Sequence, residues 1–275
     1  MAETSSFTHK ARPEPRASLV PLLALLLASV LLIPFNLWVV GGAAAMVFFL
    51  SLPAETPQRQ VRYLALAASL LILVFAPIST DLDWVHIGRL ALHFALALLV
   101  PWLILRRRDP EVITYKFWPD KLEWVEVFYT AIAFPLAYGI LRFYFVIASP
   151  EVPFNWTLPP EPDNLELFKL FMGINGVGIW DELFFINTSY AIIRALFPYK
   201  IANPAQAVIY TTVLWTMAFR GIGPILVYLF ALTQGAMYER SKSLLWVLIV
   251  HLIVDYFLFQ RIIASHYPNL SVWWH

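Results

Sequence analysis

The sequence contains no cysteine and little charge. Of its 275 residues none is Cys, and only 13% are Asp, Glu, Lys or Arg. The missing cysteine excludes disulfides, a thiolate nucleophile and any metal site with sulfur ligands. A soluble domain is typically about 25% charged. This shortage of charge, together with 60% hydrophobic residues and a mean hydropathy of +0.69, predicts an integral membrane protein.

Several motifs of other enzyme classes are also missing. The sequence has no His-Glu-x-x-His, no Gly-x-Ser-x-Gly and no glycine-rich nucleotide-binding loop. His86, Arg89 and His93 share one face of an expected helix, but they lie near its end, where such side chains reach the membrane interface. We therefore expect no metal and no cofactor. The basic residues are confined to short connections, which argues against a nucleic-acid partner.

Nine apolar segments have about the length that a membrane span requires, which is roughly 20 residues. They cover 18–35, 37–53, 61–79, 84–105, 121–147, 166–197, 204–219, 222–239 and 243–264. The first two are separated only by a step at Pro34, so they form either a tight hairpin or one long kinked segment. We predict an all-α fold, a polytopic transmembrane helical bundle of about nine spans.

The connections between these segments alternate in charge. Basic residues gather in every second connection, most densely at Arg106, Arg107 and Arg108, whereas the other connections carry acids such as Asp81 and Glu161. Cytoplasmic loops of membrane proteins carry an excess of Lys and Arg. We therefore expect the bacterial inner (cytoplasmic) membrane, with the N-terminus in the cytoplasm and the C-terminus outside.

Polar residues within the apolar segments divide the chain. Residues 18–105 are rich in Leu and Ala with few polar interruptions, whereas the segments within 121–265 carry acids, amides and a histidine. We expect a disordered cytoplasmic tail (1–17), a group of N-terminal transmembrane helices (18–105), a core that holds the chemistry (121–265) and a C-terminal tail (266–275).

Two ionisable pairs stand inside apolar segments of the core. Asp181 and Glu182 are adjacent in one segment, and His251 and Asp255 lie one helical turn apart in another. An Asp at the centre of a membrane helix costs roughly 2.5 to 3.5 kcal/mol on insertion scales, so such residues usually face a polar cavity. Both pairs should lie at similar depth. We expect them to line one cavity, where a carboxylate and an imidazole converge on a water molecule.

A structural alternative exists for each pair. The two acids could be tied to a cation on another helix, such as Arg142. His251 and Asp255 could form a hydrogen-bonded packing pair that serves stability alone.

Three segments of the core form an ordered series of motifs. Asp181-Glu182-Leu183-Phe184-Phe185-Ile186-Asn187 comes first, Trp215-Thr216-Met217-Ala218-Phe219 second and His251-Leu252-Ile253-Val254-Asp255 third. The series resembles the CAAX-processing and bacteriocin-processing (CPBP, or ABI) family of intramembrane proteases, whose pattern is Glu-Glu-x-x-x-Arg, Phe-x-x-x-His and His-x-x-x-Asn or Asp. Two positions depart from the pattern: Ile186 stands where the family has Arg, and Phe219 where it has His.

The resemblance implies a CPBP-like core and an intramembrane endopeptidase that cuts near the C-terminus of a membrane-associated protein or peptide. By this resemblance Asp181 and His251 activate water, Asp255 orients or assists it, and Glu182 supports these groups from behind. The residues expected along the substrate groove are Trp215, Phe219 and Asn187.

Two other functions remain as alternatives. The first is a catalytically inactive CPBP homologue that acts as a membrane scaffold or binding partner, which the two departures favour. The second is a small proton-coupled transporter that uses the buried acids as relay groups.

Overall fold

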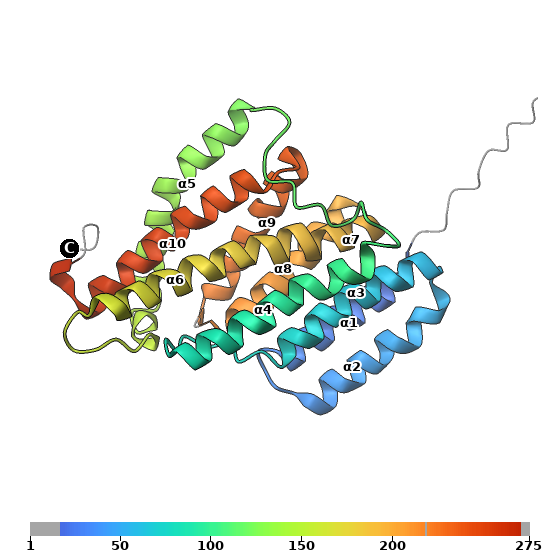
Figure 1. Ribbon diagram of the computed structural model, residues 1–275, viewed down its shortest axis with the longest axis horizontal. Helices are drawn as coiled ribbons and strands as arrows, with labels where there is room; N and C mark the ends of the chain where they lie inside the picture. The colour runs from blue at the N-terminus through green and yellow to red at the C-terminus, as the bar shows by residue number, and fades with distance from the viewer. Residues whose placement is uncertain (1–16, 218, 271–275) are drawn as a thin grey trace, which may run out of the picture.

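The chain folds into a bundle of helices. The computed structural model describes residues 17–217 and 219–270, so nearly all of the tail expected at 1–17 lies outside the described residues. Every regular element in the described residues is helical, which confirms the all-α prediction (Figure 1). The main helices are α1 (Leu19–Leu32), α2 (Trp38–Ser51), α3 (Pro57–Val74), α4 (Trp84–Leu105), α5 (Trp124–Arg142), α6 (Asn164–Asp181), α7 (Ala191–Leu196), α8 (Tyr199–Trp215), α9 (Gly223–Ser241) and α10 (Leu244–His266).

Side-chain caps fix where several of these helices begin, among them α4, α6 and α10. Asp83 accepts hydrogen bonds from the backbone N–H groups of Val85 and His86 at 3.0 and 2.9 Å and so starts α4. Asp163 does the same for α6, and Ser243 does so for α10. The first N–H groups of a helix have no partner within the helix, so an Asp or Ser at this position stabilises its start by about 1 kcal/mol.

The first two helices form a hairpin. Asn36, with φ 52°, makes the turn between α1 and α2, and the two helices pack closely against each other. Each has 14 residues and is therefore about 21 Å long, shorter than the roughly 30 Å hydrocarbon core. The turn settles the step at Pro34 in favour of a hairpin. Because a hairpin returns to the side from which it started, the direction of the later helices does not depend on how deeply it inserts.

Three helices of the described residues are long and apolar enough to cross a membrane by themselves. They are α4, α5 together with its π-helical end (Trp124–Ala148), and α10. The helices α1 and α2 are apolar but shorter. The sixth expected span is one continuous rod made of α6, a π-helical segment (Glu182–Tyr190) and α7. These apolar helices agree with the membrane protein that the composition predicts.

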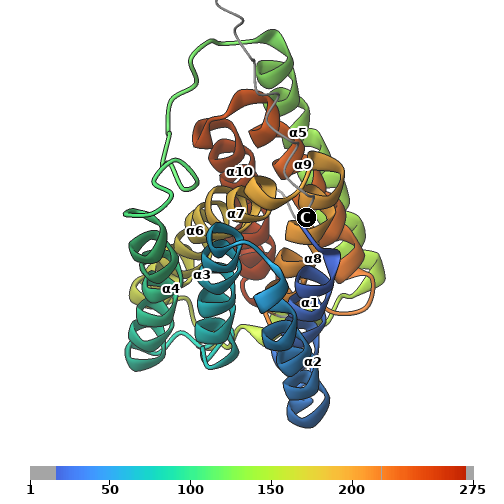
Figure 2. The same cartoon turned by 90° about the vertical axis from the view of Figure 1, so that its right-hand side faces the viewer.

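The helix α10 lies at the centre of the core. It packs between α5 and α6 in both views (Figures 1 and 2). The helix α4 joins the core through Trp180 on α6, whose ring stacks on Phe94 at 3.8 Å and whose indole N–H donates to the Phe94 carbonyl at 2.9 Å. The π-helical segment is buried throughout except at Leu183. Such wide turns are frequent at functional sites because they change the direction of the side chains that follow.

Candidate active site

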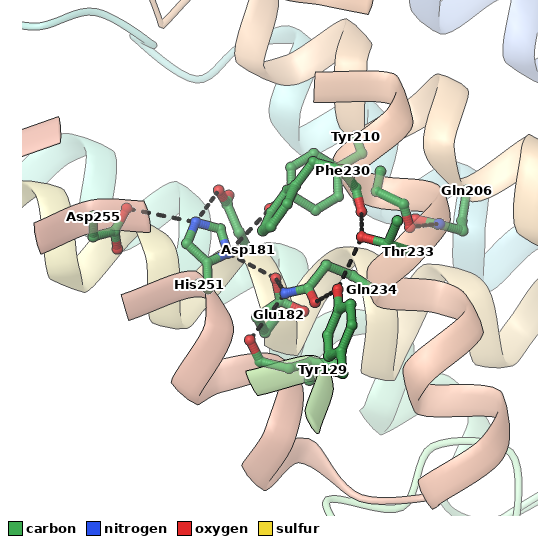
Figure 3. Close-up of polar contacts among 12 residues, drawn as sticks. Tyr129, Asp181, Glu182, Gln206, Tyr210, Phe230, Thr233, Gln234, His251 and Asp255 are labelled. Carbon is green, nitrogen blue, oxygen red and sulfur yellow. Dashed lines mark hydrogen bonds and ion pairs between the residues drawn. The ribbon is translucent and has the colours of Figure 1, made fainter. Parts of the chain in front are cut away.

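The imidazole of His251 is surrounded by carboxylates. Its Nδ1 lies 2.7 Å from Oε1 of Glu182, and its Nε2 lies 3.7 Å from Oδ2 of Asp181 and 3.6 Å from Oδ1 of Asp255 (Figure 3). Asp181 and Glu182 end α6 and begin the π-helical segment, while His251 and Asp255 lie on α10. All four side chains are at most 5% exposed. The structure therefore brings together the two pairs that the sequence singles out.

The hydrogen bond at Nδ1 decides the orientation of the ring. A carboxylate accepts hydrogen bonds, so the contact with Glu182 assigns the proton to Nδ1 and leaves Nε2 as the nitrogen that faces Asp181 and Asp255. The Nε2 distances exceed those of a direct hydrogen bond. At 3.6 and 3.7 Å these groups leave no room for an atom directly between them, so an oxygen that contacts both, such as that of water or of a substrate carbonyl, would lie beside them on the cavity side.

Glu182 is held in turn by groups of other helices. The side-chain amide of Gln234 on α9 donates to Oε1 of Glu182 at 3.0 Å and to the Val247 carbonyl at 2.9 Å. The Tyr129 hydroxyl donates to Oε1 of Gln234 at 3.1 Å. This chain of hydrogen bonds ties α5, α9, α10 and the π-helical segment together behind the imidazole, so the orientation of His251 depends on all four.

Tyr210 on α8 completes the surroundings of His251. Its hydroxyl lies 3.1 Å from Nδ1, the same nitrogen that contacts Glu182. The side chain is fully buried. Neither the composition nor the motif order marks this residue, because a tyrosine in an apolar helix has many ordinary uses in packing. The sequence offered better signals for Gln234, a polar side chain inside an apolar segment, and for Gly178, which stands one turn before Asp181.

Gly178 allows α10 to approach α6. A Cβ atom at this position would overlap Oδ2 of Asp255 and would lie 2.9 Å from both Cγ of Asp255 and Cδ2 of His251. Only a residue without a side chain fits between the two helices here. The contact of the motif pair with α6 therefore depends on a glycine outside the motif.

Three carboxylate oxygens of the cluster are buried without a hydrogen-bond partner among the described residues. They are Oδ1 of Asp181, Oε2 of Glu182 and Oδ2 of Asp255. Buried polar atoms in folded proteins nearly always have a partner, and leaving one unpaired destabilises the fold. Such a concentration is unusual for a purely structural ion cluster and is suited to a site that receives a polar reactant.

A cavity of about 480 Å³ opens beside this cluster, and Asp181, His251 and Asp255 lie in its wall. Glu182 is not among its lining residues, so it supports the imidazole from the side away from the cavity. The remaining wall is mostly apolar and comes from α4, α6 and α10. The volume falls within the range of small-ligand sites.

A second cavity of about 260 Å³ lies between α5, α9 and α10. Three residues line both cavities, namely Leu214, Phe219 and Val254. Phe219 follows the end of α8 and stacks on Tyr144 with ring centroids 6.2 Å apart. Phe219, which stands where the middle motif of the CPBP pattern has His, therefore lies in the partition between the two cavities.

The other two residues expected along the groove lie elsewhere. The ring of Trp215 packs edge-on against Phe35 at 5.4 Å and lines neither cavity. Asn187 is fully buried in the π-helical segment, where its Oδ1 accepts a hydrogen bond from the Tyr238 hydroxyl at 2.9 Å. The wide π turn directs this side chain toward α9, so neither Trp215 nor Asn187 has a place in these cavities.

The structural alternative for the acidic pair does not fit the geometry. Arg142, the cation considered for that role, donates to the Tyr138 hydroxyl at 2.6 Å and lies over the Tyr138 ring. The acids instead gather around His251. Within the described residues, no group of three or more His, Asp or Glu side chains is placed to hold a metal ion.

Comparison with known proteins gives one match. Residues 163–257, about a third of the chain, match the family model of type II CAAX prenyl endopeptidase Rce1-like proteins. This region contains all three motif segments and the four clustered side chains. No curated protein and no solved structure shows significant similarity to the chain. The match and the motif order agree: residues 163–257 are similar to the Rce1-like proteins of the CPBP family.

Proposed function

We propose that the chain is an intramembrane endopeptidase that cuts a peptide bond near the C-terminus of a membrane-associated protein. One observation carries the proposal: the Nε2 side of His251, flanked by Asp181 and Asp255, lies in the wall of a cavity large enough for a peptide. The family match supports the same reaction class, because CAAX prenyl endopeptidases cut peptide bonds.

We assign a role to each member of the cluster from its contacts. Glu182 holds the proton on Nδ1 and orients the ring, as the buried carboxylate does in other imidazole-based hydrolytic sites. His251, through Nε2, and Asp181 accept the proton of a water molecule that contacts both of them from the cavity. Asp255 fixes the position of this water from the other side. Because all these groups are buried, they need little rearrangement during the reaction.

The reaction then follows ordinary amide hydrolysis. The water oxygen adds to the carbonyl carbon while its proton passes to the His251 and Asp181 pair. The C–N bond breaks, and the same proton is delivered to the leaving amine nitrogen. The products are a new carboxyl terminus and a released peptide. No group beyond this chain and water is required for the atoms to balance.

The proposed placement in the membrane follows from the charges of the connections. Every dense cluster of Arg and Lys lies on one side, with Arg106, Arg107 and Arg108 between α4 and α5. We place this side in the cytoplasm of a bacterial cell. Residues 18–105 then form the N-terminal helices and 121–265 the protease core.

The test compares single substitutions at the cluster with a matched control. Membranes from a deletion strain, complemented in turn with the wild type and each variant, are analysed by mass spectrometry for new protein C-termini. We expect Asp181→Asn and His251→Ala to abolish the cleavages that the wild type restores. Arg89→Ala, an exposed side chain on α4 outside the cavity wall, should leave them intact. Processing by both cluster variants at the wild-type level would exclude the protease function.

The inactive-homologue alternative is favoured by one observation. Phe219 occupies the position of a motif His and offers no hydrogen-bonding group to the cluster. If the wild-type and deletion strains have identical C-termini while a membrane complex is lost on deletion, the chain is a scaffold. If the wild type restores cleavages, Phe219 is compatible with catalysis.

A further inference from the structure

The larger cavity lies in one half of the bundle. Its lining residues on α4 run from Ile87 to Leu98, and on α6 from Leu170 to Asp181. The stretch on α4 lies toward the end of the helix that adjoins the connection 75–83, and the stretch on α6 lies in that half of the continuous rod 164–196 that follows the connection 149–163. The cavity also includes Ser79, Thr80 and Asp81 of the first connection and Trp156 of the second. It therefore reaches from the His251 cluster to the side of the bundle that carries these two connections.

The chemistry of the wall changes along this path. Ser79, Thr80 and Asp81 make a polar mouth, and Asp181, His251 and Asp255 make a polar floor. Between them the wall consists mainly of apolar side chains and of the glycine face of α6. A Cβ at Gly176 would meet nothing within 4 Å, and one at Gly173 only a single atom at 4.0 Å. The backbone of α6 is therefore open to the cavity along this face.

The opposite half of the bundle is closed behind the cluster. Gln234 and Asn187 are fully buried, and Tyr238 and Trp246 are 7% and 8% exposed. The hydrogen bonds of Gln234 to Glu182 and to the Val247 carbonyl cross this layer. This packed layer separates His251 from the basic connections, including 106–123. A peptide on that side has no path to His251 through these groups.

We infer that the substrate peptide reaches the cluster from the side of the acidic connections, between α4 and α6, and not from the side of the basic connections. In the topology proposed above, this is the non-cytoplasmic side of the membrane. The inference rests on the proposed function for its substrate, a peptide, but the direction of access rests only on the shape of the cavity.

The length and walls of the path define the peptide further. Leu170 and Asp181 are eleven positions apart on α6, which corresponds to about 16 Å along the helix. An extended peptide rises about 3.3 Å per residue, so about five residues span this distance. The matching substrate is an extended segment of about five mostly apolar residues, exposed on the non-cytoplasmic face and adjoining the bond that is cut.

The absence of cysteine makes the direction of access directly measurable. Single cysteines are introduced as Gly176→Cys in the cavity wall, Ser79→Cys at its mouth and Arg107→Cys in the opposite connection. Spheroplasts and inverted membrane vesicles are each treated with a membrane-impermeant maleimide, which reacts with thiols in contact with water. Ser79→Cys and Arg107→Cys report the two sides of the membrane in the same preparations.

We expect Gly176→Cys to be labelled in the preparation that labels Ser79→Cys and to be protected where Arg107→Cys reacts. Labelling together with Arg107→Cys, labelling from both sides, or no labelling from either side would each overturn the inference. The same pattern in an Asp181→Asn background is expected, because access does not require catalysis. Correct labelling without any wild-type cleavage would leave the direction of access standing and reject only the protease function.

Discussion

Replacement of Gly178 by alanine is the sharpest probe of how the site is assembled. The added Cβ would overlap Oδ2 of Asp255 and press on Cδ2 of His251. Because a Cβ that overlaps Oδ2 cannot be accommodated, Asp255 must change rotamer or α10 must move outward. Either change separates the motif pair from Asp181.

The effect of Gly178→Ala on the free energy of unfolding can be separated from helix propensity by comparison with a matched substitution two positions earlier. Gly176→Ala on the same helix meets nothing within 4 Å, and it should stabilise α6 by about 0.5 to 1 kcal/mol because alanine favours helix. Gly178→Ala has the same gain in helix propensity but adds overpacking, typically about 1 to 3 kcal/mol. The difference between the two variants in the free energy of unfolding therefore isolates the steric effect, about 1 to 3 kcal/mol.

The two variants are compared by SDS-induced unfolding in mixed micelles and by the C-terminal mass spectrometry described above. We expect Gly178→Ala to lose about 10²-fold in cleavage, since an error of about 1 Å in the placement of reacting groups has an effect of this size. Gly176→Ala adds a methyl group to the cavity wall but leaves the cluster in place, so we expect it to lose much less. Equal stability and equal cleavage for both variants would show that α10 does not need to contact α6 this closely, and the geometry of the cluster would have to be reconsidered.

Three further predictions concern the support of the cluster, the partition and the topology. Gln234→Leu removes the donor to Glu182 and should lower the free energy of unfolding by about 1 to 3 kcal/mol, measured in the same micelles; an unchanged value would mean that Glu182 is held by other groups. Phe219→Ala joins the two cavities, so we expect a wider range of cleaved sequences, and an unaltered inventory of C-termini would argue against a partition. Reporter fusions after Arg108 and after Glu161 should report opposite sides of the membrane, and the same side for both would reject the proposed orientation.

The helices were predictable because long apolar runs with clear ends dominate this sequence. Each expected segment corresponds to a helix, and the Asp and Ser residues before α4, α6 and α10 are the caps that end the preceding connections. The least certain step, at Pro34, is also where local sequence is ambiguous between a kink and a turn. The structure resolves it through packing of α1 on α2, which no local pattern contains.

The cluster was predictable only in part. The pairing of His251 with Asp255 follows from their spacing, but the shortest contact of the ring is with Glu182, on another helix. Which acid meets Nδ1 depends on how the helices rotate about their axes, and the π-helical segment that begins at Glu182 changes this rotation. The contact of the Tyr210 hydroxyl with His251 also depends on the rotation of the helices about their axes. Sequence spacing determines neighbours within one helix, whereas contacts between helices depend on packing.

The connection between α4 and α5 supplies hydrogen-bond acceptors to the start of α10. The carbonyl of Lys116 accepts the backbone N–H of Leu244 at 2.9 Å, and that of Phe117 accepts the N–H of Leu245 and the Ser243 hydroxyl at 3.0 and 2.6 Å. The first turn of the helix that carries His251 is thus completed by a stretch lying upstream of the motif-bearing core. A recombinant fragment cut at residue 121 would leave the Leu244 amide without the Lys116 carbonyl, so fragments of this protein made for expression should retain residues 106–120.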